Sequence, residues 1–160
     1  MNNTDHYLDV LGQINLDDLH IQQAFNYYEE QYEKSELAQQ FVQASCLIAD
    51  EFKEHSLIGF CDRTMGRNIP KRKSQEGAAI RGSLQRSGLV RASGHELFRG
   101  CIVFSTHDIN GCVLSAVGYR VGRIREGDKP IVYWQKPDPR AFVDTGMRLA
   151  KELINAKALH

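Results

Sequence analysis

Basic residues concentrate in one short segment, and their chemistry suits a phosphate-binding surface. Between residues 63 and 91 there are eight lysines and arginines but a single acid, Glu76. Cations in a loop can follow a phosphate backbone and release its counterions, and arginine can also fork onto phosphate oxygens or stack on bases. The segment predicts a nucleic-acid-binding surface. The alternative is a solvated face that only balances acidic helices elsewhere. The eight cations are Arg63, Arg67, Lys71, Arg72, Lys73, Arg81, Arg86 and Arg91.

Further cations and several aromatic residues extend this pattern downstream. Arg99, Arg120, Arg123, Arg125 and Lys136 continue the basic run. Tyr119 and the pair Tyr133-Trp134 lie beside cations, as stacking residues for single strands do, although strand alternation allows only one of Tyr133 and Trp134 to face the core. The predicted nucleic-acid contacts are Arg63, Arg67, Lys71, Arg72, Lys73, Arg81, Arg99, Tyr119, Arg120, Arg123 and Lys136.

Other kinds of site find little support in the residue spacing. Cys46, Cys61, Cys101 and Cys112 form no C-x-x-C pair. His95-Glu96 and His107-Asp108 are neighbours in sequence, so on a strand their side chains point to opposite faces and cannot chelate as a unit. No nucleophile, P-loop or metalloprotease motif is present. We therefore predict no catalytic residues, no metal and no cofactor, and interpret the cysteines as small buried apolar residues.

Composition and charge place these residues in one globular domain. The chain has 160 residues, of which 42% are hydrophobic and 25% charged. Its net charge is zero, but residues 1–56 carry a net charge of −9 and residues 57–160 a net charge of +9. Such asymmetry points to a polyanion-facing surface on the basic part. No stretch approaches the roughly 20 apolar residues of a membrane span, and no signal peptide is evident, so we expect a cytoplasmic protein.

The acidic third of the chain has helical patterns. Apolar residues recur at helical spacing from Leu16 to Lys34. Ser35 and Ser45 are suited to cap a second and a third helix. Residues 57–60 predict a strand, and residues 62–73 an exposed loop in which Lys71, Arg72 and Lys73 are mobile.

The basic part predicts one helix and then a small sheet. Residues 75–87 read as a helix that ends at a glycine cap, Gly88. The runs 101–104 and 112–117 flank an Asn110-Gly111 turn and predict a hairpin, and residues 131–134 add a third antiparallel strand. A last helix begins near Pro139. The prediction is an α+β domain with a helical extension (1–34), a core (35–138) and a C-terminal helix (139–160).

Six segments resemble one family in the same order. They are Phe52 with Leu57-Ile58-Gly59-Phe60, Ser83 to Val90, Leu97 to Phe104, Asp108 to Leu114, Val117-Gly118-Tyr119-Arg120, and Tyr133 to Asp138. The pattern resembles the amino-terminal part of the polymerase core of bacterial replicative primases, between the zinc-binding and Toprim domains. Gly59 to Arg120 is even more similar to the primase-like segment of zinc-finger proteins of mobile elements.

The chain also departs from the family pattern. Cys101 and Val132 stand where the family has basic residues, Ser105 where it has proline, and Tyr119 where it has glycine. No N-terminal zinc ligands or Toprim carboxylates are evident. The resemblance implies a non-catalytic protein that binds single-stranded DNA or RNA in the replication or transfer of a mobile element, with a helicase or a Toprim-containing primase as a further partner. The alternative is a protein-interaction module that binds a replication protein through the acidic helices and the last helix.

Overall fold

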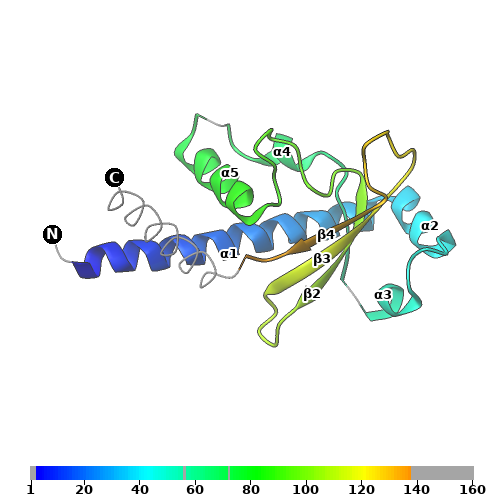
Figure 1. Cartoon of the computed structure of the whole chain (residues 1–160), viewed down its shortest axis with the longest axis horizontal. Coiled ribbons are helices and arrows are strands. Elements are labelled where there is room, and N and C mark those ends of the chain that lie inside the picture. Colours follow the sequence, from blue (N-terminus) through cyan, green and yellow to red (C-terminus); the bar gives the residue numbers. More distant parts are fainter. Residues whose placement is uncertain (1–2, 56, 72, 138–160) are drawn as a thin grey trace, which may run out of the picture.

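The computed structural model describes residues 3–55, 57–71 and 73–137, and it confirms the predicted α+β class (Figure 1). The strands form one antiparallel sheet in the order β1-β2-β3-β4. The predicted helix from Pro139 lies outside the described residues. In chain order, the elements are α1 (Asn3–Lys34), α2 (Glu36–Ala44), α3 (Asp50–His55), β1 (Leu57–Phe60), α4 (Met65–Asn68), α5 (Gln75–Ser87), β2 (Cys101–His107), β3 (Val113–Arg120) and β4 (Ile131–Gln135).

The helix boundaries show which capping predictions hold. Ser35 caps α2 by accepting a hydrogen bond from Ala38 N at 3.1 Å, and Gly88 closes α5 in the left-handed region with φ 83°. Ser45 does not begin a helix. Its N–H donates to the carbonyl of Phe41 and so ends α2, and α3 starts only at Asp50. The reason is that the chain bends after Ser45 to bury Ile48 against the sheet.

The segment after β1 is more ordered than an exposed loop. Residues 65–68 form the short helix α4, because Met65 is buried in the core and anchors this turn. Lys71 and Lys73 are exposed in non-helical backbone. Arg72 lies outside the described residues, and the mobility of this segment stays a prediction.

The β2–β3 hairpin forms as its turn sequence predicts. Asp108 Oδ1 accepts hydrogen bonds from Asn110 N and Cys112 N, both at 2.9 Å, and Gly111 adopts a φ of 83°. The register pairs Cys101 with Arg120 and Phe104 with Val117. The far end of the hairpin therefore brings Arg120 beside the segment that precedes β2.

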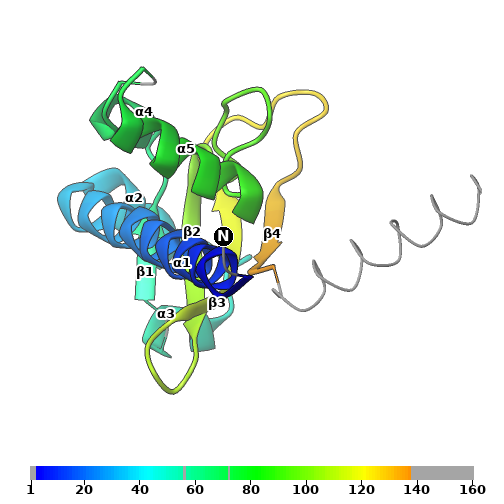
Figure 2. The same cartoon turned by 90° about the vertical axis from the view of Figure 1, so that its left-hand side faces the viewer.

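Helices α1 and α5 cover one face of the sheet, as Figure 2 shows along the axis of α1. Phe25 of α1 contacts the rings of Tyr28, Phe98 and Trp134, with centroids 5.3–6.4 Å apart. The approach of α1 to β1 requires glycine at position 59, since a Cβ there would lie 2.6 Å from the Cβ of Tyr28. The helix predicted as an extension thus builds the core.

The opposite face of the sheet is covered in part by α2. Ala38 and Val42 of this helix, together with Ile48, pack on Ile102 and Phe104 of β2. Among the described helices, none combines the length and apolar composition that a bilayer span requires.

Candidate nucleic-acid interface

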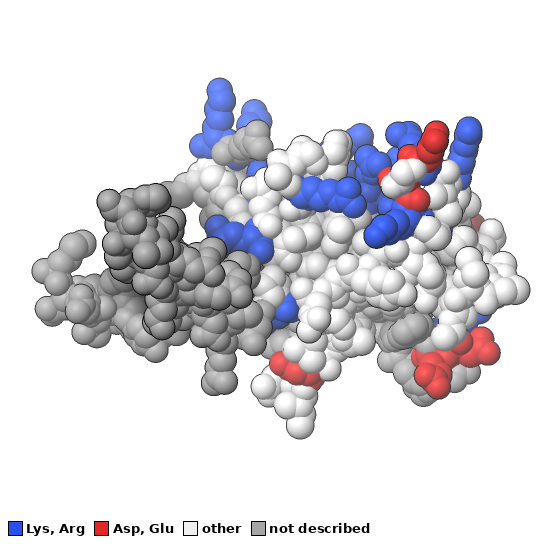
Figure 3. Space-filling model, in the orientation of Figure 1, with Lys and Arg blue, Asp and Glu red and all other residues white. Residues whose placement is uncertain are grey.

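Exposed cations gather along one rim of the molecule. Figure 3 shows them along the upper edge, over α4, α5 and the loops at the end of the sheet. Acidic side chains lie at the lower centre and lower right of this view, and also among the cations at the upper right. Within the described part of the chain, none of the exposed members forms an ion pair with a carboxylate. We call this set the basic rim. It comprises Arg63, Arg67, Lys71, Lys73, Arg123, Arg125 and Lys129.

Local backbone chemistry holds the first part of the rim in place. Ser74 caps α5 by accepting a hydrogen bond from Gly77 N at 3.0 Å, and its hydroxyl donates to the carbonyl of Lys71 at 2.7 Å. Arg63 adopts a φ of 72°, a region that L-residues with a Cβ disfavour by about 1–2 kcal/mol. In this conformation its guanidinium lies against Gly100. Arg63 therefore reaches from the end of β1 to the start of β2.

A small polar cavity of about 70 Å³ lies at this end of the sheet. The guanidinium of Arg120 is fixed there by two backbone carbonyls: Nη1 donates to Arg99 O at 2.9 Å and Nε donates to Lys129 O at 3.1 Å. The two predicted contact residues Arg99 and Arg120 thus lie side by side at this end of the sheet. We call this cavity the arginine pocket. Its lining residues are Arg91, Ser93, His95, Glu96, Leu97, Arg99, Arg120 and Asp128.

One wall of the arginine pocket leads to buried thiols. Cys61 Sγ donates to Glu96 Oε1 at 3.4 Å, and Cys101 lies beside Cys61 on the paired strand. Burial raises the pKa of Glu96, an effect that the Cys61 thiol partly offsets and the charge of Asp62 increases. Burial also raises the pKa of Cys61 well above its ordinary value and that of Cys101 to about 11. Both sulfurs therefore stay protonated at neutral pH and are poor nucleophiles.

The other two cysteines, Cys46 and Cys112, are exposed, so the prediction that the cysteines are buried is right for only two of the four. Among the residues that the structure describes, no three histidine, cysteine or acidic side chains are grouped so as to hold a metal ion.

Two predicted contact residues are engaged inside the protein. Arg81 donates to the carbonyls of Gly66 and Pro70 at 3.3 and 3.5 Å and so joins α5 to the segment around α4. Lys136 forms an ion pair with Asp18 of α1 at 2.7 Å. Lys136 thus balances the charge of an acidic helix, which was the alternative to its role as a nucleic-acid contact.

The aromatic candidates separate by burial. Tyr119 is 8% exposed and packs edge-on against Phe104 with centroids 5.7 Å apart, so it belongs to the core and its expected role as an exposed stacking residue is corrected. Trp134 is 6% exposed and donates from Nε1 to Ser87 O at 2.7 Å, whereas Tyr133 is 76% exposed. The alternation predicted for Tyr133 and Trp134 is confirmed. Tyr133 is the aromatic residue of the three that a base can reach.

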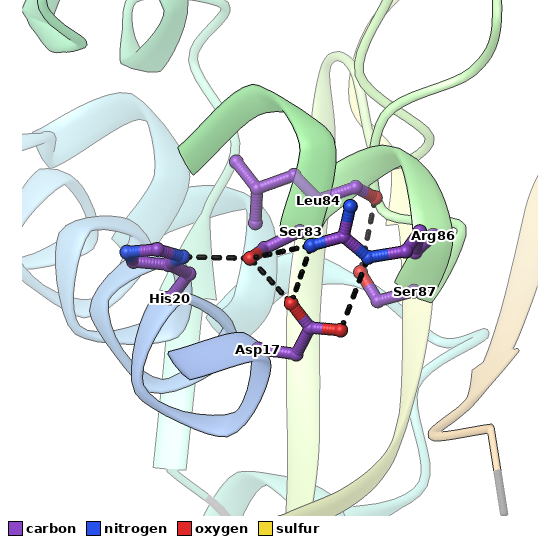
Figure 4. Close-up of polar contacts among 6 residues, drawn as sticks. All are labelled: Asp17, His20, Ser83, Leu84, Arg86 and Ser87. Carbon is purple, nitrogen blue, oxygen red and sulfur yellow. Dashed lines mark hydrogen bonds and ion pairs between the residues drawn. The ribbon is translucent and has the colours of Figure 1, made fainter. Parts of the chain in front are cut away.

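A polar network that the sequence did not reveal joins α1 to α5 (Figure 4). Arg86 forks onto Asp17, with Nη2 to Oδ1 at 2.7 Å and Nε to Oδ2 at 3.2 Å. Ser83 Oγ donates to Asp17 Oδ1 at 2.6 Å and lies 2.7 Å from His20 Nδ1. We call these four residues the α1–α5 latch. Arg86 belongs to the cationic run in the sequence, but in the structure it holds α1 and α5 together.

The latch has the residue types of a hydrolase triad but not its accessibility. Ser83 is 1% exposed in the middle of α5, so no substrate can reach its hydroxyl. Burial alone would raise the pKa of Asp17, but the hydrogen bonds from Arg86 and Ser83 outweigh burial and lower it. The network therefore stabilises the contact between the two helices.

Comparisons with known proteins bear on the fold. No family model matches the chain, and no curated protein does. Among solved structures, the Aquifex aeolicus primase (zinc-binding and RNA polymerase domains) superposes with a TM-score of 0.58 and 14% identity over 79% of this chain and 30% of that chain. A DnaG primase catalytic domain bound to ssDNA gives 0.55 and 20% identity over 80% and 41%. The E. coli primase catalytic core gives 0.54 and 18% identity over 76% and 39%.

These similarities agree with the six sequence segments that resemble primases. This chain spans less than half the length of the primase chains it matches. At these identities the likeness concerns the fold alone. The chain therefore has a primase-like fold.

Proposed function

We propose that this protein binds single-stranded DNA through the basic rim and the arginine pocket. The observation that carries the proposal is the rim itself: its exposed cations share one side of the molecule and have no carboxylate partner within the described residues. Cations that are already paired release few counterions when a phosphate approaches, whereas unpaired ones supply the full electrostatic term. Tyr133, exposed on β4, is available to stack on a base.

The fold supports the same proposal. One structure with this fold is a DnaG primase catalytic domain bound to ssDNA. We further propose that this chain is a non-catalytic relative of the amino-terminal subdomain of the primase polymerase core, acting in the replication or transfer of a mobile element. Cys101 and Val132 are buried where the family pattern has basic residues, so part of the family's cationic cleft is replaced by core.

Salt dependence of binding tests this proposal directly. Fluorescence anisotropy with labelled single-stranded DNA, duplex DNA and RNA of one length would be measured at 50 and 200 mM salt. Four phosphate contacts give a slope of about −3 in log K against log salt, so single-strand affinity should fall on the order of fifty-fold. Absence of binding at the lower salt would overturn the proposal, and equal affinity for duplex would remove the single-strand assignment.

A second candidate function rests on the surface around α2 and α3. Leu37 and Leu47 are 65% and 74% exposed near the acidic residues Glu36, Asp50 and Glu51. Apolar side chains in an acidic surrounding suit a protein partner with a basic, apolar segment, such as a helicase or a Toprim-containing primase. Capture of one such protein with little dependence on salt, and loss of the capture in Leu37→Ala, Leu47→Ala, would favour this function over DNA binding.

A further inference from the structure

We infer that the arginine pocket receives the terminal phosphate of a nucleic-acid strand, a phosphomonoester, whereas the basic rim contacts phosphodiesters within the strand. The inference rests on the proposed function, because it assigns a part of the bound strand to each part of the surface.

The size of the pocket sets the first constraint. A cavity of about 70 Å³ has room for a group of a few heavy atoms, since about 10–15 Å³ of such space already holds one water molecule. A nucleoside, with a base and a sugar, is far larger. Three separate segments line the cavity, namely 91–99, the end of β3 at Arg120 and the turn that contains Asp128. A phosphate can enter this space most easily when it carries one ester branch.

The donors form the second constraint. Arg91 and Arg99 make no side-chain hydrogen bond or ion pair with any described residue, so their guanidinium donors remain available. Arg120 uses Nε and one N–H of Nη1 for hydrogen bonds to backbone carbonyls, and its other three N–H donors remain unused. Because those two carbonyls fix its guanidinium, Arg120 loses little side-chain entropy when a ligand binds. The pocket is thus lined by three arginines with unused N–H donors, and the guanidinium of one of them, Arg120, is already held in place.

The charge of the ligand is the third constraint. Glu96 and Asp128 also line the pocket and offset two of its three arginines, so the long-range attraction for any phosphate is weak. Affinity must then come from short, charge-assisted contacts made with several arginines at once. A terminal phosphate offers three free oxygens and a charge of about −1.5 to −2, whereas a phosphodiester offers two oxygens and one charge. The terminal group matches this donor set better.

The test compares strand ends. One internally labelled deoxythymidine decamer would be prepared with a 5′-phosphate, with a 3′-phosphate, or with both ends as hydroxyls, and anisotropy would give three affinities at one salt concentration. We expect one phosphorylated form to bind about tenfold tighter than the hydroxyl form, and the preferred form identifies the end that the pocket takes. Inorganic phosphate should erase this preference before it displaces the hydroxyl form.

Matched variants separate the pocket from the rim. Arg99→Ala should abolish the preference, so that the affinities of the three forms become equal within about twofold of one another. Arg123→Ala, on the rim and outside the pocket, should weaken all three forms alike and keep the preference. Equal binding of the three forms to the folded wild-type protein would overturn the inference and leave the proposed function standing. Failure of all three to bind at low salt would overturn the proposed function and this inference with it.

Discussion

The guanidinium of Arg120, at the end of β3, donates a hydrogen bond to the backbone carbonyl of Arg99, just before β2, at 2.9 Å. One arginine thus shapes the backbone that carries another. A second hydrogen bond from Arg120 reaches the carbonyl of Lys129 in the loop before β4. The contact explains how two like charges share one end of the sheet: the cation of Arg120 faces carbonyl dipoles, and the Arg99 side chain is left for a ligand.

Replacing Arg120 by lysine tests this role. An ammonium is a compact charge and cannot hold two carbonyls in the planar fork of a guanidinium, so Arg120→Lys should lower the free energy of unfolding by about 1–2 kcal/mol. Chemical denaturation would measure the loss. The comparison is Arg123→Lys, which is exposed and should leave stability unchanged. Equal stabilities of the two variants would argue against a positioning role for Arg120.

The α1–α5 latch makes a prediction about stability and pH. Because hydrogen bonds from Arg86 and Ser83 lower the pKa of Asp17 in the folded protein, its contribution is present at neutral pH and is lost as the pH falls through the folded pKa. Asp17→Asn should therefore destabilise the protein at pH 7, and the gap to wild type should narrow at pH 3. Urea denaturation at both pH values measures this gap. A gap of the same size at both would show that the charge of Asp17 contributes nothing.

Two glycine-to-alanine substitutions test how closely α1 packs on β1: one at Gly59, where the two elements touch, and one at Gly66, in open space. Gly59→Ala would place a Cβ 2.6 Å from the Cβ of Tyr28 and push α1 away from β1, with an expected loss of about 1–3 kcal/mol. Gly66→Ala in α4 meets nothing within 4 Å and should be neutral or slightly stabilising. Thermal unfolding of both variants gives the comparison. Similar melting temperatures would contradict the close approach of α1 to the sheet.

Glu96 lines the arginine pocket, and its ionisation should make the stability of the protein depend on pH. Burial raises the pKa of this carboxyl, so ionisation of Glu96 makes a destabilising contribution that appears as the pH rises through the range between its unfolded and folded pKa values. Glu96→Gln keeps the shape without the charge. The stability of this variant relative to wild type should therefore increase from pH 4 to pH 7.5.

At pH 7.5, Glu96→Gln should also bind a 5′- or 3′-phosphorylated decamer more tightly than wild type does. Anisotropy measures this affinity, and denaturation measures the stability. Unchanged affinity in the folded variant would show that the charge of Glu96 has no effect on phosphate binding. Of the groups around this carboxyl, the Cys61 thiol and the charge of Asp62 act on its pKa, and the same pocket is lined by Arg91, His95, Arg99, Arg120 and Asp128.

Much of the fold could be predicted from local sequence. The Asn110-Gly111 turn, the Ser35 cap and the Gly88 cap each depend on a few neighbouring residues, and all three form as expected. The prediction that Ser45 begins a helix was wrong, because capping chemistry alone does not say whether the helix lies before or after the serine. The burial of Ile48 against the sheet decided it.

The site was harder to predict, because pairing across the chain decides which cations are available. Asp17 and Arg86 are 69 residues apart, and no periodicity connects them. Lys136 and Asp18 are also far apart in the sequence, and only the tertiary structure brings them together. Tyr119 looked exposed beside Arg120, but the strand alternation that turns Arg120 to one face turns Tyr119 into the core on the other. The pairing of Arg99 with Arg120, by contrast, follows from the register of the hairpin, which is a local property.

The most direct test of the account is the salt dependence of single-strand binding in a rim variant. The quadruple variant Arg67→Ala, Lys71→Ala, Lys73→Ala, Arg123→Ala removes exposed cations that have no carboxylate partner among the described residues. Lys34→Ala, at the end of α1, serves as the control. Anisotropy with an unphosphorylated single strand at several salt concentrations should show the slope of the quadruple variant reduced by about 3, and that of the control unchanged. A folded quadruple variant with the wild-type affinity and slope would contradict nucleic-acid binding by the basic rim.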